Sequence, residues 1–180
     1  VLRRMKRYYT RERYLEVVGA LRDARPDLAL TTDVIAGFPG ETDEDFAQTL
    51  SLLDEVGFTG SFSFKYSPRP GTPALKLADR DAVPDEVASA RLTAYQDRQR
   101  ALSVAWHQAH EGRVVDVLVE GPSAHDEGVV CGRTPQNVMM NFPGDEGLVG
   151  STVRVRATRG FTNSCRGEQI VRPTSSVRVI

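Results

Sequence analysis

The chain has 180 residues, of which 40% are hydrophobic and 26% charged, and its formal net charge is −1. These values are ordinary for a globular protein and exclude a disordered or collagen-like chain. No stretch of about 18 apolar residues is present, so we expect no membrane partner. The basic N-terminus lacks the apolar core of a secretory signal. Two cysteines are too few for a disulfide framework, and we therefore expect a cytoplasmic protein.

The charges are unevenly distributed along the chain. Residues 1–13 carry six basic side chains and one acid, residues 148–180 carry six arginines and one acid, and the middle is acidic. Basic patches on a nearly neutral protein favour a polyanionic partner. A solvated surface accounts for the charge pattern equally well, so this observation leaves both interpretations open.

The first half of the chain alternates between predicted helices and strands. Thr10 is expected to cap a helix that ends before Pro26, with an apolar stripe at helical spacing (Tyr14, Val17, Val18, Leu21). The β-branched segment 28–38 predicts a buried strand. Thr42 is expected to cap a second helix that ends at Gly57 and buries one apolar face (Phe46, Leu50, Leu53, Val56).

Residues 61–66 predict a second strand, because Phe62, Phe64 and Tyr66 alternate with polar residues. Helices and strands of these lengths indicate parallel βαβ packing. A parallel sheet needs more than two strands. The first half of the chain is therefore expected to be the end of a larger α/β domain.

A long helix is predicted over residues 84–111, beginning at Pro84. Its stripe is expected to dock on a neighbouring domain (Ala88, Leu92, Tyr95, Gln99, Leu102, Trp106, Ala109). Five short segments follow, separated by Gly, Pro and Asn, and they include STVRVRATRG and QIVRP. Such strands predict a small β-barrel, an architecture that often binds oligonucleotides.

Two loops follow the predicted parallel strands, at the edge where open α/β sheets bind ligands. In GFPGET, Gly37 and Gly40 would let the backbone approach a ligand, although a plain tight turn explains the same residues. In YSPRPGTPA, three prolines would stiffen the loop and Arg69 would present a cation to an anionic ligand. A structural strand exit with an exposed arginine is the alternative.

The predicted barrel contains one strand with a basic face. Arg154 and Arg156 should point to the same side, with Arg159 after them, while Val153 and Val155 face the interior. Such a strand suits contact with phosphates, or it is simply a solvated sheet face. The spacing of the cysteines and histidines indicates no metal site, and no nucleophilic triad is suggested.

Three segments, VLRRMKRYYTRERYLEVV, TTDVIAGFPGETDEDF and FSFKYSPRPGTPA, resemble the methylthiotransferase family of radical S-adenosylmethionine enzymes. The tail, with VLVEG, GRTPQNVMMNF and NSCRGE, resembles the TRAM domain, an RNA-binding barrel. The resemblance implies an α/β fold: the C-terminal part of an open parallel (β/α) radical SAM barrel, followed by a small all-β, OB-like TRAM barrel. The implied boundaries are residues 1–83 for the radical SAM part, 84–111 for a connecting helix and 112–180 for the TRAM barrel.

The family resemblance also implies an activity. Such enzymes add a methylthio group to carbon 2 of an isopentenylated adenosine next to the tRNA anticodon, using S-adenosylmethionine and two [4Fe-4S] clusters. The family's C-x-x-x-C-x-x-C motif is absent from this chain. We therefore expect no cluster ligands here, an inactive fragment on its own, and partnership with a missing N-terminal part of the same enzyme. The sulfur donor is left open.

The resemblance assigns several residues. Ile35, Gly37, Phe38 and Pro39 would line the S-adenosylmethionine pocket, and Arg7 would pair with the cofactor carboxylate or support the barrel. Substrate contacts would come from Tyr66, Ser67 and Arg69, tRNA contacts from Arg133, Arg154, Arg156 and Arg159, and Cys165 would be a core residue. No catalytic residue and no metal ligand is assigned.

Two alternatives stay open. The sister branch of the family modifies an aspartate of a ribosomal protein, but usually carries acidic residues where Arg69 and Pro70 stand. A stand-alone tRNA- or RNA-binding module is the second alternative. Three cysteines at the family spacing in the upstream reading frame would distinguish the enzyme from the module.

Overall fold

A computed structural model of the chain describes residues 1–170, which form two compact units that divide between Ser103 and Val104. The predicted strand QIVRP and Arg172 and Arg178 of the basic tail lie partly or wholly outside the described residues. No helix within residues 1–170 is long and apolar enough to cross a membrane. The elements of the first unit are α1 (Arg11–Ala24), β1 (Thr31–Ala36), α2 (Asp43–Val56), β2 (Gly60–Lys65), α3 (Pro73–Asp81) and most of α4 (Asp85–Gln108).

Local chemistry at the helix ends matches the predictions closely. The Thr10 hydroxyl accepts a hydrogen bond from the Arg13 amide and caps α1. Thr42 and Asp45 form a reciprocal capping box on α2, and Gly57 ends that helix in the left-handed conformation. The capping hydrogen bond from the Thr42 backbone lowers the pKa of Asp45.

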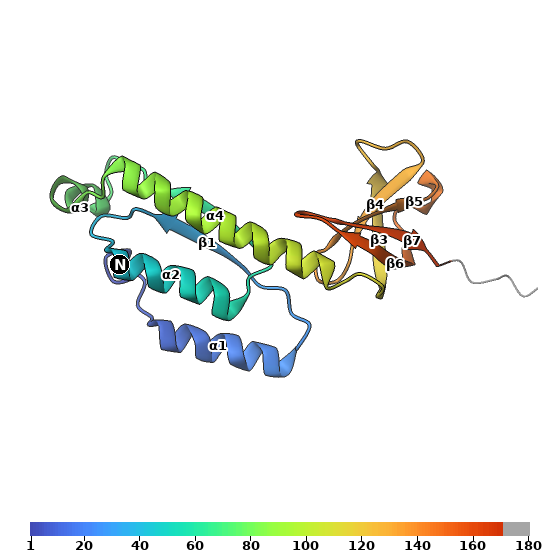
Figure 1. Ribbon diagram of the computed structural model, residues 1–180, viewed down its shortest axis with the longest axis horizontal. Helices are drawn as coiled ribbons and strands as arrows, with labels where there is room; N and C mark the ends of the chain where they lie inside the picture. The colour runs from blue at the N-terminus through green and yellow to red at the C-terminus, as the bar shows by residue number, and fades with distance from the viewer. Residues whose placement is uncertain (171–180) are drawn as a thin grey trace, which may run out of the picture. The chain divides into compact units, whose positions relative to one another are not determined.

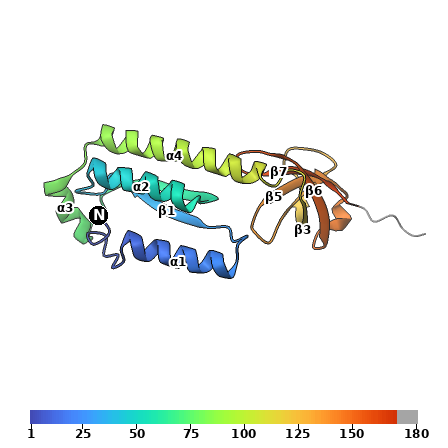
Figure 2. The same cartoon turned by 60° about the horizontal axis from the view of Figure 1, so that its bottom comes forward.

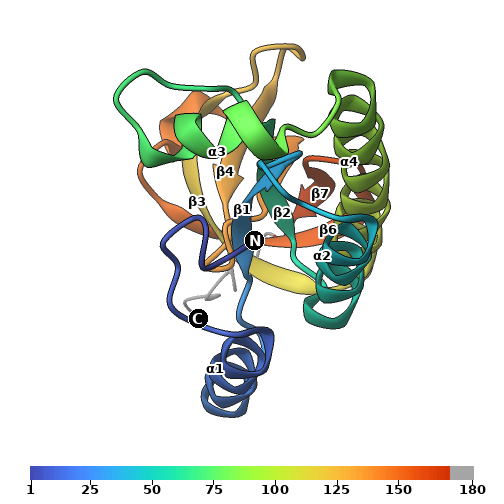
Figure 3. The same ribbon diagram turned by 90° about the vertical axis from the view of Figure 1, so that its left-hand side faces the viewer.

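In the first unit, β1 and β2 pair in parallel, with Ala36 opposite Lys65. Figure 3 shows α2 and α4 on the same side of this pair, and α1 runs beside α2 in Figures 1 and 2. The core between helices and strands contains Val18, Leu53 and Tyr95, with Val34 packed against it. The covered face of the sheet is therefore the one that carries Val34.

The opposite face of the sheet is open, and it is the more aromatic of the two. Phe62 is 72% exposed, Phe64 is 56% exposed and Ile35 is 41% exposed. The prediction of a buried strand over 28–38 was therefore wrong for one of its faces. Exposed side chains on this scale are unusual for a complete α/β sheet, whose two faces are both covered.

Three further predictions in the first unit need correction. The stripe of α1 is only partly covered, because Val17 and Leu21 are more than 40% exposed. Pro73 begins helix α3 and does not stiffen a loop. The stripe of α4 does not dock on a neighbouring domain along its whole length: Tyr95 joins the core of the first unit and the buried Gln99 amide donates to the Phe58 carbonyl, whereas Trp106 packs against the barrel core.

The second unit is a closed five-stranded barrel, as expected from the sequence, and its strand order is β3-β4-β5-β7-β6. The strands are labelled in Figure 1. Its elements are β3 (Val114–Pro122), β4 (Val129–Arg133), β5 (Met139–Pro143), a 3-10 turn η1 (Glu146–Leu148), β6 (Thr152–Gly160) and β7 (Cys165–Gln169). The fifth strand is Cys165–Gln169, which includes the first residue of the predicted segment QIVRP, while residues 171–173 of that segment lie outside the described residues. Val117, Met140, Phe142 and Val155 fill the interior.

The last turn of α4 packs tightly against β6 of the barrel. A Cβ atom on Gly160 would lie 2.4 Å from the His107 carbonyl carbon and 2.4 Å from the Gln108 nitrogen. Gly160 also donates its backbone N–H to the Glu111 carboxylate over 2.9 Å. Only glycine allows this approach of the two backbones.

Gly160→Ala is expected to destabilise the second unit by roughly 1–3 kcal/mol, because backbone atoms would have to move apart. Urea unfolding followed by the fluorescence of Trp106, the single tryptophan, measures this change. Gly121→Ala in β3 is the control, since its Cβ would meet nothing within 4 Å, and it should change the free energy of unfolding by less than about 0.5 kcal/mol. Equal effects of the two substitutions would contradict the packing described here.

Candidate functional site

The parallel pairing brings two loops to one edge of the sheet. Residues 37–42 follow β1 and residues 66–72 follow β2. The Tyr66 amide donates to the Ala36 carbonyl over 2.8 Å, which ties the starts of the two loops together. This carboxyl edge is where ligands of open α/β sheets bind.

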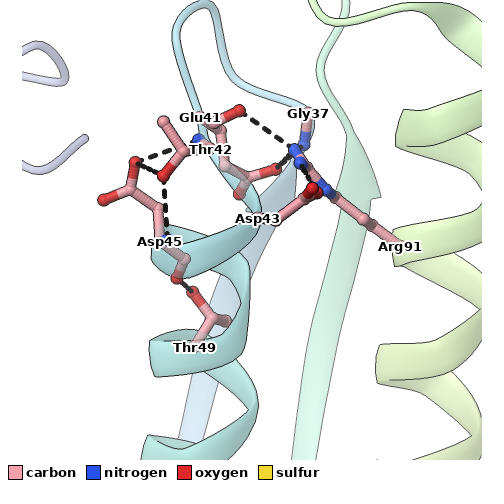
Figure 4. A network of polar contacts seen from close by, with 7 residues as sticks. All are labelled: Gly37, Glu41, Thr42, Asp43, Asp45, Thr49 and Arg91. Carbon is pink, nitrogen blue, oxygen red and sulfur yellow. Dashed lines mark hydrogen bonds and ion pairs between the residues drawn. The ribbon is translucent and has the colours of Figure 1, made fainter.

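A buried ion pair holds the first loop in shape (Figure 4). The Glu41 carboxylate, 4% exposed, accepts from the Gly37 amide over 2.8 Å and from the Arg91 guanidinium over 2.8 Å. Arg91 also donates to the Glu41 carbonyl over 3.1 Å and to the Asp43 carboxylate over 2.6 Å. Arg91 of α4 therefore holds the end of the loop directly, and Glu41 connects that end to Gly37 at its start.

The charge balance around Arg91 favours its ionised form. Burial alone would lower the pKa of Arg91, but the hydrogen bonds and charges of Asp43 and Glu41 outweigh burial and raise that pKa. A buried carboxylate is costly without such a partner. The loop conformation therefore depends on Arg91 as well as on its own residues.

The two loop glycines have positive φ angles of 73° and 81°, which favour glycine. The close approach that they permit is to the chain itself. A Cβ on Gly37 would lie 2.4 Å from the Ala88 Cβ of α4, and one on Gly40 would lie 2.1 Å from the Arg4 guanidinium. The expected approach to a ligand is therefore not needed to explain either residue.

The residues assigned to the cofactor occupy different environments. Phe38 and Pro39 are buried, and the Phe38 ring meets the Tyr66 ring edge-on at 5.2 Å. Ile35 lies on the open sheet face. Arg7 is exposed and forms no ion pair within residues 1–170. The Gly37 amide donates to the Glu41 carboxylate, and its Cα packs closely against Ala88.

The residues assigned to the substrate begin the second loop. The Tyr66 hydroxyl is buried and has no hydrogen-bond partner among the described residues. Ser67 and Arg69 are exposed, and the Arg69 guanidinium is unpaired within residues 1–170. The structure thus brings Ile35, Tyr66, Ser67 and Arg69 to one edge of the sheet.

The four barrel arginines that were assigned to tRNA differ in whether they already have a partner on the protein. Arg154 and Arg156 lie on the outer face of β6, opposite Asp116 and Val114 of β3, and neither forms an ion pair in the described part of the chain. In contrast, Arg133 pairs with Glu120 over 3.4 Å and donates to Asn137 over 2.9 Å. The Arg159 guanidinium lies 5.1 Å from the centre of the Phe161 ring. Arg154 and Arg156 are therefore the freest of the four.

The cysteines do not fit an iron-sulfur cluster. Cys165 is fully buried, its thiol donates to the His107 carbonyl, and burial, aided by the Glu111 charge, raises the pKa of the thiol to about 11. Cluster ligands are thiolates. No group of three His, Cys, Asp or Glu side chains within residues 1–170 could hold a metal ion. The expected role of Cys165 as a core residue agrees with its burial.

Sequence reasoning did not identify Glu41 or Arg91. The glutamate stands inside the GFPGET motif, so an acid at a loop–helix junction could have been suspected of accepting backbone amides. Arg91 is fifty residues further along the chain. No spacing signal connects it with the loop, because the contact exists only once α4 has packed on the unit.

Comparison with known families identifies both parts of the chain. Residues 1–53 match the model of the radical SAM superfamily, and residues 108–170 match that of the TRAM domain. The chain therefore contains the end of a radical SAM domain and a TRAM domain, as the sequence indicated.

The names of individual relatives are more specific than the two family models. The chain is 46% identical over 175 residues to the tRNA-2-methylthio-N(6)-dimethylallyladenosine synthase of Symbiobacterium thermophilum, covering 97% of this chain and 37% of the relative. It is 48% identical over 171 residues to the protein of that name from Geobacter metallireducens, covering 95% of this chain and 38% of the relative. The resemblance to the methylthiotransferase family of radical SAM enzymes is confirmed, and the chain spans a little over a third of the length of these relatives.

Arg91→Ala should destabilise the first unit by about 3–5 kcal/mol, because it leaves the Glu41 carboxylate buried without its cation. Urea unfolding followed by circular dichroism measures the change. Arg100→Ala is the control, since its pair with Asp97 is more than 60% exposed and should contribute no more than about 0.5 kcal/mol. Adding Glu41→Gln to Arg91→Ala removes the unpaired charge and should recover part of the loss; no recovery would contradict the electrostatic explanation.

Cys165 should resist alkylation in the folded protein. Because its pKa is raised to about 11, hardly any thiolate forms at about pH 8, and only the thiolate is reactive. Iodoacetamide followed by mass spectrometry should label the half-buried Cys131 first and Cys165 only after denaturation. Labelling of both cysteines at one rate in the folded chain would show that Cys165 is not buried as described.

Proposed function

We propose that this chain is part of an enzyme that adds a methylthio group to carbon 2 of N6-isopentenyladenosine next to the tRNA anticodon, by radical SAM chemistry in the cytoplasm. The names of the relatives support the reaction. The observation that carries the proposal is the carboxyl edge, where two loops meet beside an open apolar sheet face. The TRAM barrel supplies an unpaired basic strand for the nucleic acid.

The open face has the apolar and aromatic surface that would suit the adenosyl part of S-adenosylmethionine. Ile35, at the end of β1, offers exposed apolar surface beside Phe64, its partner in the strand register. The buried, unpartnered Tyr66 hydroxyl follows on the next strand, at the same edge. When bound, S-adenosylmethionine supplies the radical that starts the reaction. In this proposal Ile35 contacts the cofactor and Tyr66 belongs to the substrate side of the site, whereas Glu41 and Arg91 position the loop through Gly37.

The same arrangement accounts for Phe38 and Pro39. Both are buried, so their contribution is to the loop shape and to the placement of the Tyr66 ring, against which Phe38 packs. Arg7, Ser67 and Arg69 are exposed and available to the substrate or to the cofactor carboxylate. Their assignment rests on the family resemblance and on their location around one sheet edge.

The iron-sulfur chemistry belongs elsewhere in this proposal. No group of three possible metal ligands exists within residues 1–170, and the relatives are more than twice as long as the matched region. We infer that both [4Fe-4S] clusters are held by an N-terminal part of the same enzyme and that residues 1–180 alone are inactive. That part would also cover the open face of β1 and β2.

The barrel is proposed to dock the anticodon stem-loop of tRNA through β6. Arg154 and Arg156 share one exposed face of a regular strand and have no competing ion pair within residues 1–170. Arg133 and Arg159 are proposed as additional RNA contacts. Each already has a partner on the protein, Glu120 and Phe161 respectively, which the RNA would have to replace. Phosphate contacts of this kind give affinity but little sequence information.

The double variant Arg154→Glu, Arg156→Glu tests the docking face. Fluorescence anisotropy with an anticodon stem-loop RNA should show about ten-fold weaker binding. The plot of log affinity against log salt should flatten by roughly 1.4 to 1.8, since two phosphate contacts are lost.

Arg98→Glu with Arg100→Glu makes the same change in net charge and is the matched control. Both of these arginines are already paired with aspartates on the protein. The control should bind RNA almost as the unmodified chain does. If the two double variants lose affinity equally, β6 is not the docking face and only the overall charge matters.

A further inference from the structure

The unpaired cations of the first unit are not scattered. Among residues 1–103, most lysines and arginines have a carboxylate or carbonyl partner, for example Arg11 with Glu55, Lys65 with Asp85 and Arg98 with Asp54. Six have no such partner within the described chain, and all six lie in segments 1–10 and 66–81: Arg3, Lys6, Arg7, Arg69, Lys76 and Arg80. Cations left without local partners are available to an external anion.

The two segments meet at the carboxyl edge of the sheet. Segment 66–81 follows β2 directly. The Arg4 guanidinium donates to the Asp81 carboxylate over 2.7 Å and to the Pro39 carbonyl over 3.4 Å. The Gly40 amide donates to the Asp81 carbonyl over 2.7 Å. These bonds bring the N-terminal segment, the first loop and the end of α3 together, as Figures 1 and 2 show.

The N-terminal segment is anchored on both sides of Lys6 and Arg7, and Arg3 lies within its first turn. Its first turn is closed by the Arg7 amide, which donates to the Leu2 carbonyl over 2.9 Å. Arg4 holds the segment to the loop, and on the other side the Tyr9 ring packs 6.1 Å from the Tyr14 ring of α1. The residues between these anchors are therefore held outward by a defined backbone and are not part of a loose tail.

Tyr8 stands between the anchors, and its side chain is 84% exposed. It makes no aromatic contact within residues 1–170. An exposed aromatic ring next to unpaired cations is the combination that single-stranded nucleic acids need, because bases stack on the ring while phosphates contact the cations. Four exposed acids lie near the same edge, but Asp43 and Asp85 are already paired with Arg91 and Lys65. Only Glu44 and Asp79 are left to face the cations, which remain in excess.

We propose that these residues form a second RNA-binding surface, the basic rim, made of Arg3, Lys6, Arg7, Tyr8, Arg69, Lys76 and Arg80. Its ligand is a single-stranded stretch of RNA, with phosphates on the cations and one unstacked base on Tyr8. The inference rests on the proposed function, because that RNA would be the anticodon loop. It adds a contact at the sheet edge that is separate from β6 of the barrel.

The test uses the 180-residue chain with two RNA probes, an anticodon stem-loop and a blunt duplex of equal length. Tyr8→Ala should weaken binding of the stem-loop about five-fold or more and leave duplex binding unchanged. Tyr8→Phe keeps the ring and should bind as the unmodified chain does. Arg3→Gln with Lys6→Gln should flatten the salt dependence by roughly 1.4 for a single-stranded ligand.

Arg13→Gln with Arg25→Gln is the matched control, because these exposed arginines already pair with Glu16 and Asp27. Circular dichroism verifies that each variant is folded. Unchanged stem-loop affinity in the Tyr8 and Arg3/Lys6 variants, while the β6 variant loses affinity, would overturn the basic rim and leave the proposed function standing. Equal loss for the duplex would overturn base stacking on Tyr8.

Two further results separate the rim from the proposed function. If the unmodified chain binds neither RNA, tRNA docking fails together with the rim. Vesicles of anionic lipid serve as a competing probe; if they bind the chain through Arg3 and Lys6 while the stem-loop does not, the rim is a membrane surface and the inference is overturned.

Discussion

Parallel strands end at the same edge of a sheet, and every functional feature of the first unit depends on that constraint. It places the loop after β1 beside the loop after β2. Helices α1, α2 and α4 cover the face that carries Val34, so Ile35, Phe62 and Phe64 stay open on the other face. In a complete α/β barrel the helices lie outside and the inner face of the strands is enclosed. The open aromatic face is therefore best understood as a wall of an interior that further strands complete.

Charged side chains have two distinct uses in this protein. Paired charges maintain the structure: Arg91 neutralises the buried Glu41, and Arg4 holds the N-terminal segment to Asp81 at the end of α3. Unpaired charges occur where an anionic partner is expected, on β6 of the barrel and at the carboxyl edge. A surface ion pair contributes little to stability, so its presence or absence is most informative about which cations are available for binding.

Local chemistry made much of the fold predictable. Thr10, Thr42 and Gly57 define helix ends through bonds made within a few residues, and alternation separates the two sides of β2 and of β6. Alternation cannot tell which side of β2 is covered, because that depends on which helices pack there. The start of α3 could not be predicted from the proline-rich residues 66–73, because Pro73 suits both a stiff loop and a first helical turn. The Glu41–Arg91 pair was unpredictable because it joins elements that meet only in the folded unit.

The central claim is that the face bearing Phe62 and Phe64 is an interior wall of a larger barrel. The most direct measurement places the photocrosslinking residue p-benzoylphenylalanine at position 64 in the protein expressed from its native gene, followed by mass spectrometry of the crosslinked peptides. The account predicts a crosslink within the same polypeptide, to residues outside the 180 described by this sequence. Crosslinks confined to residues 1–180, or reaction with solvent alone, would show that the face is not enclosed and would contradict the account.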